Sequence, residues 1–371
     1  MEIGIITPQY PPNTRGGGEI SSQILAEQLA TRTDHAIEVH SFDGRSEGQI
    51  NGVPVIRHRD TPSVPEISSL IAAHDLWNVV EDFDILHAYN MELHPAVGIL
   101  SKYKSIPSVA HLNSYTYIDK RVLGMDLAGD ERLYNNMVRP VTGGVVKRSI
   151  NQIDHIIALS NSIREIYRDY LGSKQKISRV TNMIDPEVTP ESVDYNLQSP
   201  ARVLYVGGLD AHKGVQFLIK SLDELNIPVE ARIVGGGESL SELRNLVKQR
   251  RLEEAVELCG YVPYSEVSDH YEWGDIFVHP GTWPEPLNRT LLEAMQHGLA
   301  AVVTNRGGPP EIVGDEQLIV QSGDPTSLAE GIDFAVKNRQ TVGKRNRRYI
   351  LENHHPKKVI PEITSIYQTI A

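Results

Sequence analysis

The chain alternates along its whole length between short runs of Val, Ile and Leu and longer stretches with apolar residues at helical spacing. Short apolar runs predict buried β-strands, and apolar residues that recur every three or four positions predict amphipathic helices. This alternation is typical of βαβ units, which build a parallel sheet with helices on both faces. We therefore predict an α/β protein of the doubly wound, Rossmann-like class.

The predicted strands form two groups separated by a polar segment. The first group covers residues 3–7, 36–42, 54–58, 84–90, 108–113, 155–160 and 177–182, and the second covers residues 202–206, 230–234, 256–259, 276–279, 300–304 and 317–320. Residues 186–200 contain three prolines and no apolar period, as expected of a linker. The 371 residues suffice for two domains, which we place at residues 1–190 and 200–355.

Charge, cysteine content and hydropathy argue against several classes of protein. The formal net charge of -12 disfavours nucleic acid as a partner, because proteins that neutralise phosphates are basic. The single cysteine, Cys259, excludes an internal disulfide and a four-thiolate metal site. The first residues lack the basic region of a signal peptide, and no apolar run is long enough to span a membrane. We expect a cytoplasmic protein.

Three glycine-rich loops follow predicted strands. They contain residues 16–18, residues 207–208 followed by Lys213, and residues 235–237. Ligands of open α/β sheets bind beyond the carboxyl ends of the strands, and glycine lets the backbone approach a ligand closely. Helix-end amides and the Lys213 ammonium would suit a diphosphate, although flexible turns and a solvated lysine explain the same residues. The spacing matches neither the dinucleotide fingerprint nor a Walker loop.

Two glutamates, Glu285 and Glu293, frame the start of a predicted helix. Asn288 is a good N-cap for this helix, and Gly298 marks its far end. Glu285 lies on a stiff loop between two prolines, in front of the free amides of the helix. A solvated helix face is the ordinary explanation of a glutamate such as Glu293, but its neighbours are apolar, so its carboxylate needs a specific partner such as a hydroxyl. The order carboxylate, amides, carboxylate suits a sugar nucleotide.

With these features, the sequence resembles the family 4 glycosyltransferases (glycosyl transferases group 1), retaining enzymes that use nucleotide-sugar donors. The resemblance rests on PPNTRGGGEISSQILAEQL, DILHAYN, SVAHLNS, VGGLDAHKG, IVGGGES, LCGYV and above all EPLNRTLLEAMQHGLAAVVTNRGGPPEIV. It implies the GT-B fold, in which two Rossmann-like domains face each other across a cleft. It also implies that the second domain binds the donor, and that the helix expected at residues 356–371 crosses back to the first domain.

The resemblance also implies a role for individual residues. Glu285 would contact hydroxyls of the transferred sugar, and Glu293 would contact the ribose. The other expected contacts are Lys213 with the diphosphate, the amides of Leu287, Asn288 and Arg289 with sugar and diphosphate, Tyr261 and Val262 with the base, Gly17 and Gly18 with the phosphates, and His111 with the reacting sugar. A satisfied core histidine is the alternative for His111. His87 and Tyr89, at another strand end, are weaker candidates for the acceptor side.

One position departs from the family pattern. Gly208 stands where the family often has an arginine that pairs with the lysine at the diphosphate. Arg289 could supply the missing charge, because its guanidinium can bind phosphate oxygens through two donors. Alternatively, the Arg289 side chain faces solvent or pairs with a carboxylate such as Asp210.

The expected reaction is transfer of a hexose-type sugar, with retention, to a hydroxyl of a glycan, a lipid-linked glycan or a small molecule. The nucleotide sugar is a co-substrate, and we expect no cofactor and no metal; the triplet at residues 82–84 starts a strand. A non-catalytic nucleotide-sugar-binding subunit is the alternative, and an epimerase or phosphorylase fits the glutamate motif less well. A group of basic residues in the first domain could meet anionic lipid at the inner membrane face, or could simply be solvated: Lys102, Lys104, Arg139, Lys147 and Arg148.

Overall fold

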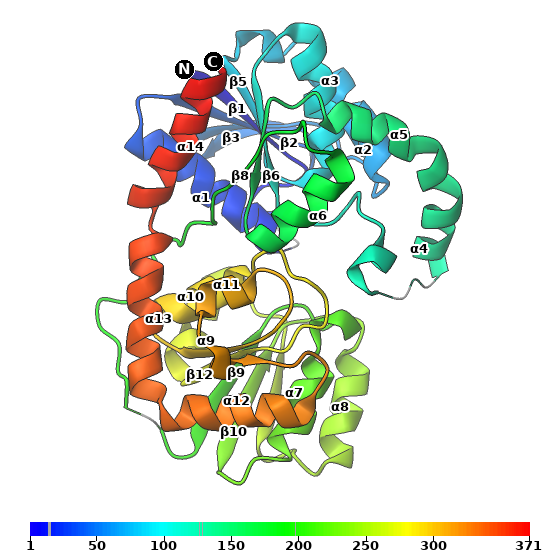
Figure 1. The fold of residues 1–371 in the computed structure, drawn as a ribbon. Helices are drawn as coiled ribbons and strands as arrows, with labels where there is room; N and C mark the ends of the chain where they lie inside the picture. The colour runs from blue at the N-terminus through cyan, green and yellow to red at the C-terminus, as the bar shows by residue number, and fades with distance from the viewer. Residues whose placement is uncertain (14–15, 126, 128, 197) are drawn as a thin grey trace. The chain divides into compact units, whose positions relative to one another are not determined.

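The computed structural model describes residues 1–13, 16–125, 127, 129–196 and 198–371. The chain divides into two compact units (Figure 1). Unit 1 comprises Met1–Met183 and Pro356–Ala371, and unit 2 comprises Ile184–His355. The chain enters unit 2 two residues before the expected linker, because Ile184 is fully buried and its amide donates to the carbonyl of His354, 3.0 Å away.

The core of unit 1 is an eight-stranded sheet in the order β3-β4-β2-β1-β5-β6-β7-β8. All neighbouring strands are parallel except β3 and β4, which form an antiparallel hairpin. The strands are β1 (Glu2–Thr7), β2 (Ala36–Ser41), β3 (Ser46–Ile50), β4 (Val53–Arg57), β5 (Ile85–Ala88), β6 (Ser108–Leu112), β7 (His155–Ala158) and β8 (Ile177–Arg179).

The strand β3 is absent from the predicted set, and its sequence explains why. Four of its five residues are exposed and none of the first four is apolar, so no apolar run marks it. The signal that does mark it is the turn Asn51-Gly52, in which both residues have positive φ angles of 48° and 82°. Asn-Gly between two strands is typical of a two-residue hairpin turn.

Helices cover both faces of the unit 1 sheet (Figure 1). They are α1 (Gly17–Arg32), α2 (Pro65–Leu76), α3 (His94–Lys104), α4 (Gly129–Leu133), α5 (Arg139–Ile150), α6 (Asn161–Leu171) and α14 (Pro356–Ile370). A π-helical turn, η4 (Tyr134–Val138), joins α4 to α5, and short 3-10 turns are η1 (Val80–Asp82), η2 (Met91–Leu93) and η3 (Lys120–Leu123). The last helix, α14, packs against α1 and thereby joins unit 1.

Unit 2 is built on a six-stranded parallel sheet in the order β11-β10-β9-β12-β13-β14. Its strands are β9 (Ala201–Val206), β10 (Val229–Val234), β11 (Val256–Gly260), β12 (Ile276–His279), β13 (Ala300–Thr304) and β14 (Ile319–Val320). Its helices are α7 (Val215–Leu222), α8 (Leu240–Gln249), α9 (Val267–Trp273), α10 (Arg289–Gln296), α11 (Pro309–Val313), α12 (Pro325–Lys337) and α13 (Arg339–Asn353), with 3-10 turns η5 (Ala211–Lys213), η6 (Tyr264–Glu266) and η7 (Glu316–Leu318). The predicted class, two doubly wound α/β units, is confirmed.

Each sheet has one point at which the order of its strands reverses. This point lies between β1 and β5 in unit 1 and between β9 and β12 in unit 2. Ligands of doubly wound sheets bind in the crevice at this point, beyond the carboxyl ends of the strands. The loops that follow these four strands are therefore where the site is to be sought.

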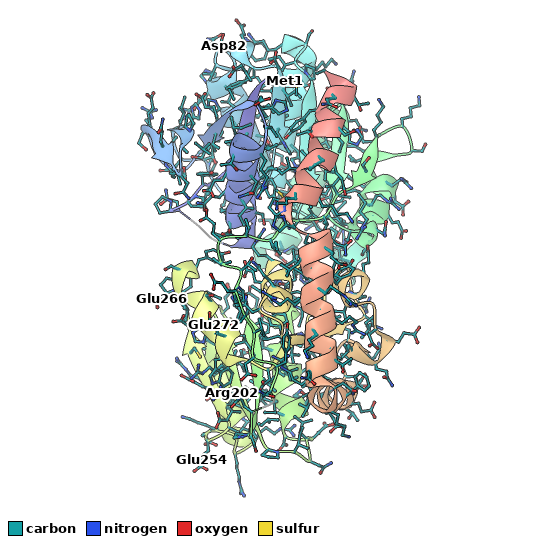
Figure 2. All side chains as sticks on the ribbon, turned by 90° about the vertical axis from the view of Figure 1, so that its left-hand side faces the viewer. Met1, Asp82, Arg202, Glu254, Glu266 and Glu272 are labelled. Carbon is teal, nitrogen blue, oxygen red and sulfur yellow. The ribbon has the colours of Figure 1, made fainter. Side chains whose placement is uncertain are left out.

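Buried side chains gather on the central strands of the sheets, and exposed charged side chains lie on the surface. Central strands such as β1 and β12 are almost wholly buried, whereas Asp82, Glu254, Glu266 and Glu272 are exposed and project outward (Figure 2). Among the described residues, no helix combines the length and the apolar character needed to cross a membrane.

Candidate active site

In unit 2, Glu285 follows β12 and binds two partners through one oxygen. Its Oε2 accepts a hydrogen bond from Lys213 Nζ at 2.8 Å and another from Trp283 Nε1 at 2.6 Å. The Lys213 ammonium also lies 5.1 Å from the centre of the Trp283 ring. The other oxygen, Oε1, accepts no hydrogen bond from the described residues. One oxygen is therefore fixed, and the other is available to a ligand hydroxyl.

The surroundings of Glu285 keep its carboxylate ionised. Burial alone would raise its pKa, but the Lys213 ammonium and the two hydrogen bonds outweigh burial, and the pKa lies below the ordinary value. His279, at the end of β12, is neutral, because burial lowers its pKa to about 4. The site therefore contains one ion pair and a neutral imidazole.

Lys213 reaches Glu285 because the loops after β9 and β12 lie in direct contact. Gly214 has a φ of +76°, and a Cβ added to it would lie 1.9 Å from the carbonyl oxygen of Pro280. The amide of Thr282 also donates to the carbonyl of His212 at 2.9 Å. No residue with a side chain fits at position 214, so Gly214 fixes where Lys213 stands.

A third loop, after β13, supports Glu285 from its backbone. The amide of Gly308 donates to the carbonyl of Glu285 at 2.8 Å. A Cβ added to Gly307 would lie 2.2 Å from the same carbonyl oxygen, and Gly307 has a φ of +71°. Sequence reasoning assigned these glycines no role, although a glycine pair in the loop after β13 was the signal that could have found them.

The helix α10 begins as predicted. Asn288 is its N-cap, and the Oδ1 atom of Asn288 accepts from the amide of Leu291 at 3.1 Å. The side-chain amide of Asn288 also lies 2.9 Å from His279 Nδ1, and Thr290 Oγ1 donates to the carbonyl of Val206 at 2.9 Å. The first amides of any helix lack intrahelical partners. Because α10 follows β12, the amides near Leu287, Asn288 and Arg289 lie at the switch point of the sheet.

Glu293 lies inside α10 and is only 3% exposed. Its two oxygens accept hydrogen bonds from the hydroxyls of Tyr264 at 2.9 Å and Tyr271 at 2.8 Å. Burial raises its pKa, and the nearby Arg289 and both hydroxyls oppose that rise without cancelling it. A ribose would be a further donor to this carboxylate, which has room for about four hydrogen bonds.

Arg289 faces neither solvent nor Asp210. Its side chain is buried, with 6% exposed, and its Nη1 lies 3.6 Å from Glu293 Oε1. The two residues are four positions apart on one helix, a spacing that favours pairing. In this structure the guanidinium therefore lies beside Glu293, which is one turn inside the helix.

The remaining residues expected at the donor lie on the loops after β9, β10 and β11. A Cβ added to Gly235 would lie 1.8 Å from the carbonyl oxygen of Gly207, so the first two of these loops touch. A Cβ added to Gly208 has Asp210 Oδ2, 3.4 Å away, as its nearest neighbour, which is an ordinary van der Waals distance. Tyr261, 75% exposed, and the partly exposed Val262 follow β11 beside Gly236.

In unit 1, Gly17 and Gly18 form the first turn of α1. A Cβ added to Gly18 would lie 2.8 Å from Asn90 Oδ1 and 3.4 Å from Asn113 Nδ2, so the ends of β1, β5 and β6 converge there. Asn113 Nδ2 in turn donates to Asn90 Oδ1. Sequence reasoning did not single out these asparagines, although Asn113 comes directly after β6 and Asn90 lies in the loop after β5. Thr14 and Arg15 of the N-terminal motif lie outside the described residues.

His111 is buried in the unit 1 sheet, with 2% exposed. Its Nδ1 lies 2.7 Å from His87 Nε2, and His87 Nδ1 lies 2.5 Å from the hydroxyl oxygen of Tyr367. The Tyr89 ring packs 4.7 Å from the ring of His111. Burial, followed by His87 and His94, holds the pKa of His111 well below its ordinary value. His111 is therefore neutral.

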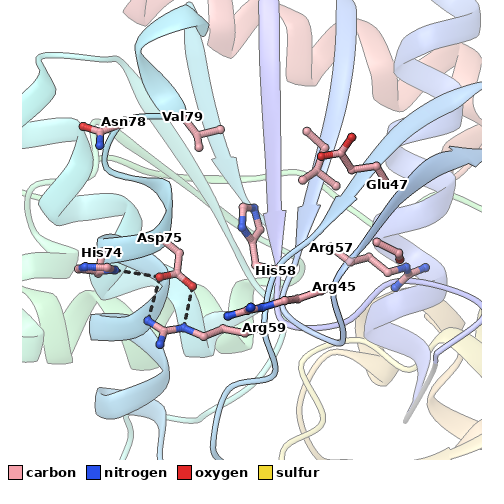
Figure 3. Close-up of a pocket in the computed structure, with 11 residues that line it drawn as sticks. Arg45, Glu47, Arg57, His58, Arg59, His74, Asp75, Asn78 and Val79 are labelled. Atoms are coloured by element: carbon pink, nitrogen blue, oxygen red, sulfur yellow. Dashed lines mark hydrogen bonds and ion pairs between the residues drawn. The ribbon is translucent and has the colours of Figure 1, made fainter.

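A cavity of about 1010 Å³ lies elsewhere in unit 1, at the β3–β4 hairpin and the end of α2 (Figure 3). Three arginines line it, but Arg59 forms two 2.8 Å hydrogen bonds to Asp75, and Arg57 is 2.5 Å from Asp43. These carboxylates neutralise two of its three guanidinium groups. We assign the cavity no part in donor binding.

The described part of the chain contains no cluster of three or more His, Cys, Asp or Glu side chains placed to hold a metal ion. The triplet at residues 82–84 has structural contacts instead. Asp84 Oδ2 accepts from the amide of Glu2 at 2.8 Å, and the Phe83 ring packs under Gly4.

Two family models match successive parts of the chain. The model of Glycosyltransferase Family 4 matches residues 15–188, and that of glycosyl transferases group 1 matches residues 191–353. An uncharacterized glycosyltransferase of Methanocaldococcus jannaschii is 23% identical over 395 residues, which cover 99% of this chain and 98% of that protein. N-acetyl-alpha-D-glucosaminyl L-malate synthase of Bacillus anthracis is 23% identical over 393 residues, covering 100% and 97%.

Solved structures of similar fold span the full chain. HepE of Anabaena in complex with UDP-glucose has a TM-score of 0.77 and 19% identity, with 100% of both chains covered. Sucrose-phosphate synthase of Thermosynechococcus elongatus has a TM-score of 0.83 and 17% identity, covering 99% of this chain and 98% of that one. The resemblance seen in the sequence motifs is confirmed: this chain is a glycosyltransferase of family 4, group 1, with the GT-B fold.

Proposed function

We propose that the protein transfers a hexose-type sugar from a nucleotide-sugar donor to an acceptor hydroxyl, with retention of configuration and without a bound metal. The observation that carries this proposal is the arrangement at Glu285. Its Oε2 is held by Lys213 and Trp283, its Oε1 accepts nothing from the described residues, and the pair stands at the switch point between β9 and β12. A sugar hydroxyl can donate to Oε1 while the adjacent ammonium faces a phosphate.

The chemistry needs no nucleophile from the protein. The acceptor oxygen forms a bond to the anomeric carbon, the bond from that carbon to the leaving phosphate breaks, and the acceptor proton passes to that phosphate. The contributions of Lys213 and the amides of α10 are to stabilise the charge that develops on the diphosphate. Glu285 contributes by fixing the position of the sugar.

The donor is tested by binding and turnover in parallel. UDP and UDP-glucose, the ligands held in the HepE structures, are the first compounds to titrate, followed by other nucleotide sugars. We expect the donor found in this way to be consumed, with equal rates before and after excess EDTA. Loss of turnover in EDTA that manganese or magnesium restores would contradict metal independence. Binding without turnover over a panel of acceptors would favour the non-catalytic subunit.

Substitution of Lys213 tests the site itself. Lys213→Ala removes the cation beside the diphosphate and leaves Glu285 buried without its ion pair, so we expect donor affinity to fall by about ten- to hundredfold. Lys248→Ala is the matched control, because Lys248 is an exposed lysine on α8 of the same unit. Equal donor affinity in both variants, measured by calorimetry, would place the diphosphate elsewhere.

On the acceptor side, we propose contact with an anionic lipid surface, as a lipid-linked acceptor would require. Four residues at intervals of four form an exposed apolar stripe on α4, η4 and α5: Leu133, Met137, Val141 and Val145. Residues 132–153 contain four basic residues and no acidic one. A basic helix with an exposed apolar face is typical of binding at an anionic membrane interface.

Vesicle sedimentation tests this surface. We expect the protein to bind phosphatidylglycerol vesicles but not phosphatidylcholine vesicles, and Val141→Asp with Val145→Asp to abolish the binding. Val122→Asp is the control, since Val122 is 74% exposed but lies outside the stripe. A concentration-dependent dimer that the double variant breaks, without vesicle binding, would assign the stripe to a second copy of the chain instead.

A further inference from the structure

Three buried side chains of unit 1 form a hydrogen-bonded chain that links the last helix to the sheet. Tyr367 is on α14, His87 is on β5 and His111 is on β6. The Tyr367 hydroxyl oxygen lies 2.5 Å from His87 Nδ1, and His87 Nε2 lies 2.7 Å from His111 Nδ1. None of the three is more than 2% exposed. The roles of donor and acceptor in this chain decide which nitrogen of His111 carries a proton.

The tyrosine end of the chain sets the direction. Burial raises the pKa of Tyr367, so its hydroxyl keeps its proton. Within the described residues, the hydroxyl makes no hydrogen bond other than that with His87. If it accepted a hydrogen bond from His87, its own hydrogen would be buried without an acceptor, with the full desolvation cost of an unsatisfied donor. Tyr367 therefore donates to His87 Nδ1.

The hydrogen bond from Tyr367 also decides which nitrogen carries the proton in each of the two imidazoles. Burial lowers the pKa of His87 to about 3, so the ring is neutral and has one proton. Because Nδ1 accepts from Tyr367, that proton is on Nε2, from which it is donated to His111 Nδ1. His111 is neutral as well, so its single proton is on Nε2.

We propose that Tyr367, acting through His87, holds His111 as the Nε2–H tautomer, so that His111 offers the ligand a hydrogen-bond donor and no base. Tyr367 and His87 are positioning residues. The role of His111 beside the sugar rests on the proposed function, whereas the tautomer does not. A hydrogen-bond donor such as Nε2–H suits the oxygen of a sugar hydroxyl. Because His111 then has no free basic nitrogen for the ligand, the proton of the acceptor substrate is left to the departing phosphate.

Nitrogen NMR of the histidines tests the tautomer without any substrate. In the full chain labelled with ¹⁵N-histidine, long-range ¹H–¹⁵N spectra distinguish a protonated from an unprotonated ring nitrogen. We expect His87 and His111 both to be Nε2–H, with their signals assigned by their loss in His87→Gln and His111→Asn. A neutral His111 with its proton on Nδ1 in the wild type would overturn the proposal, whatever the variants do.

Tyr367→Phe tests the relay. It keeps the ring and removes the donor, so we expect the His87 and His111 signals to move toward values averaged over the two tautomers. Tyr117→Phe is the control, because it removes another buried hydroxyl of unit 1, one that donates to the carbonyl of Glu92 at 2.9 Å. Unchanged tautomers in a folded Tyr367→Phe variant would refute the relay.

Turnover separates this inference from the proposed function. With an active donor and acceptor, we expect Tyr367→Phe to lower kcat by about two- to tenfold with little change in KM, and Tyr117→Phe to leave both unchanged. If the wild type has the Nε2–H tautomer but no turnover with any acceptor, the proposed function fails and the relay stands. A shifted tautomer with unchanged kcat would show that His111 is not at the reacting sugar.

Discussion

Glu285 and Glu293 belong to one motif, yet the structure treats them in opposite ways. Glu285 has a cation against one oxygen and none of the described side chains against the other, and its pKa is lowered. Glu293 has a tyrosine hydroxyl on each oxygen and an arginine at 3.6 Å, and its pKa is raised. Both are buried. The nature of the partners, and not the depth, separates an ionised group with an open oxygen from one that the protein itself largely satisfies.

Exchange of each carboxylate for an amide should give the largest difference between the two glutamates. Glu285→Gln should chiefly lower kcat, because Glu285 is expected to position the sugar at the reacting centre. Glu293→Gln should weaken donor and free nucleotide alike, because its expected ligand is the ribose. Calorimetric titration of the nucleoside diphosphate, with kinetics of the same variants, measures both. Equal loss of free-nucleotide binding in the two variants would contradict the assignment of Glu285 to the sugar.

Substitution of Arg289, a partner of Glu293, should have a smaller effect, on the affinity for a nucleoside diphosphate. If Arg289 also compensates for Gly208, Arg289→Ala should weaken a nucleoside diphosphate by about tenfold or more and the nucleoside much less, through loss of a charged hydrogen bond of about 1.5 to 3 kcal/mol. Gly208→Arg in the Arg289→Ala background should then restore part of the affinity, since a Cβ at position 208 meets no atom closer than Asp210 Oδ2 at 3.4 Å.

The control for that experiment must show whether Arg289 acts only through Glu293. Tyr264→Phe removes one hydroxyl from Glu293 and leaves the guanidinium in place. A Tyr264→Phe variant as weak for the diphosphate as Arg289→Ala, with no rescue by Gly208→Arg, would assign Arg289 to the support of Glu293 alone.

The smallest effect should be seen in how stability depends on pH. The contributions of the two glutamates to stability should change with pH in opposite directions. The lowered pKa of Glu285 means that its contribution is complete above the ordinary glutamate pKa and is lost as pH falls through the native value. The raised pKa of Glu293 means that its contribution is complete below the ordinary pKa and is lost as pH rises through the native value.

Thermal unfolding from about pH 3 to 8 measures this difference. The stability of the wild type relative to Glu285→Gln should shrink toward acid, and that relative to Glu293→Gln should grow. Glu254→Gln, at an exposed position of unit 2, is the control variant. Parallel profiles for the two buried glutamates would mean that their partners do not differ in effect.

The sequence was sufficient for every strand except β3 and for part of the site. Apolar runs marked every predicted strand, each of which overlaps a strand of the structure, and the N-cap Asn288 followed from residue type and position. The spacing of Arg289 and Glu293, four positions apart, was a signal for their pairing that went unused. The strand β3 was missed because it is polar and exposed.

Contacts between distant positions had no comparable signal. Tyr264 and Tyr271 carry nothing in their own surroundings to show that their hydroxyls meet one carboxylate. His87 and Tyr367 are 280 positions apart, and only the packing of α14 within unit 1 brings them together. Such pairs depend on tertiary packing, which a single sequence does not encode as a period or a motif.

The two-segment make-up of unit 1 affects how the protein can be made. A chain emerging from the ribosome folds its early domains first. Here the eight strands of unit 1 are synthesised before any of unit 2, but Tyr367 follows only after all of unit 2 has been translated. Until then the imidazole pair of β5 and β6 has no hydroxyl to orient it. The nascent chain can therefore form its sheet during translation, whereas the proton order of the histidine pair can be set only afterwards.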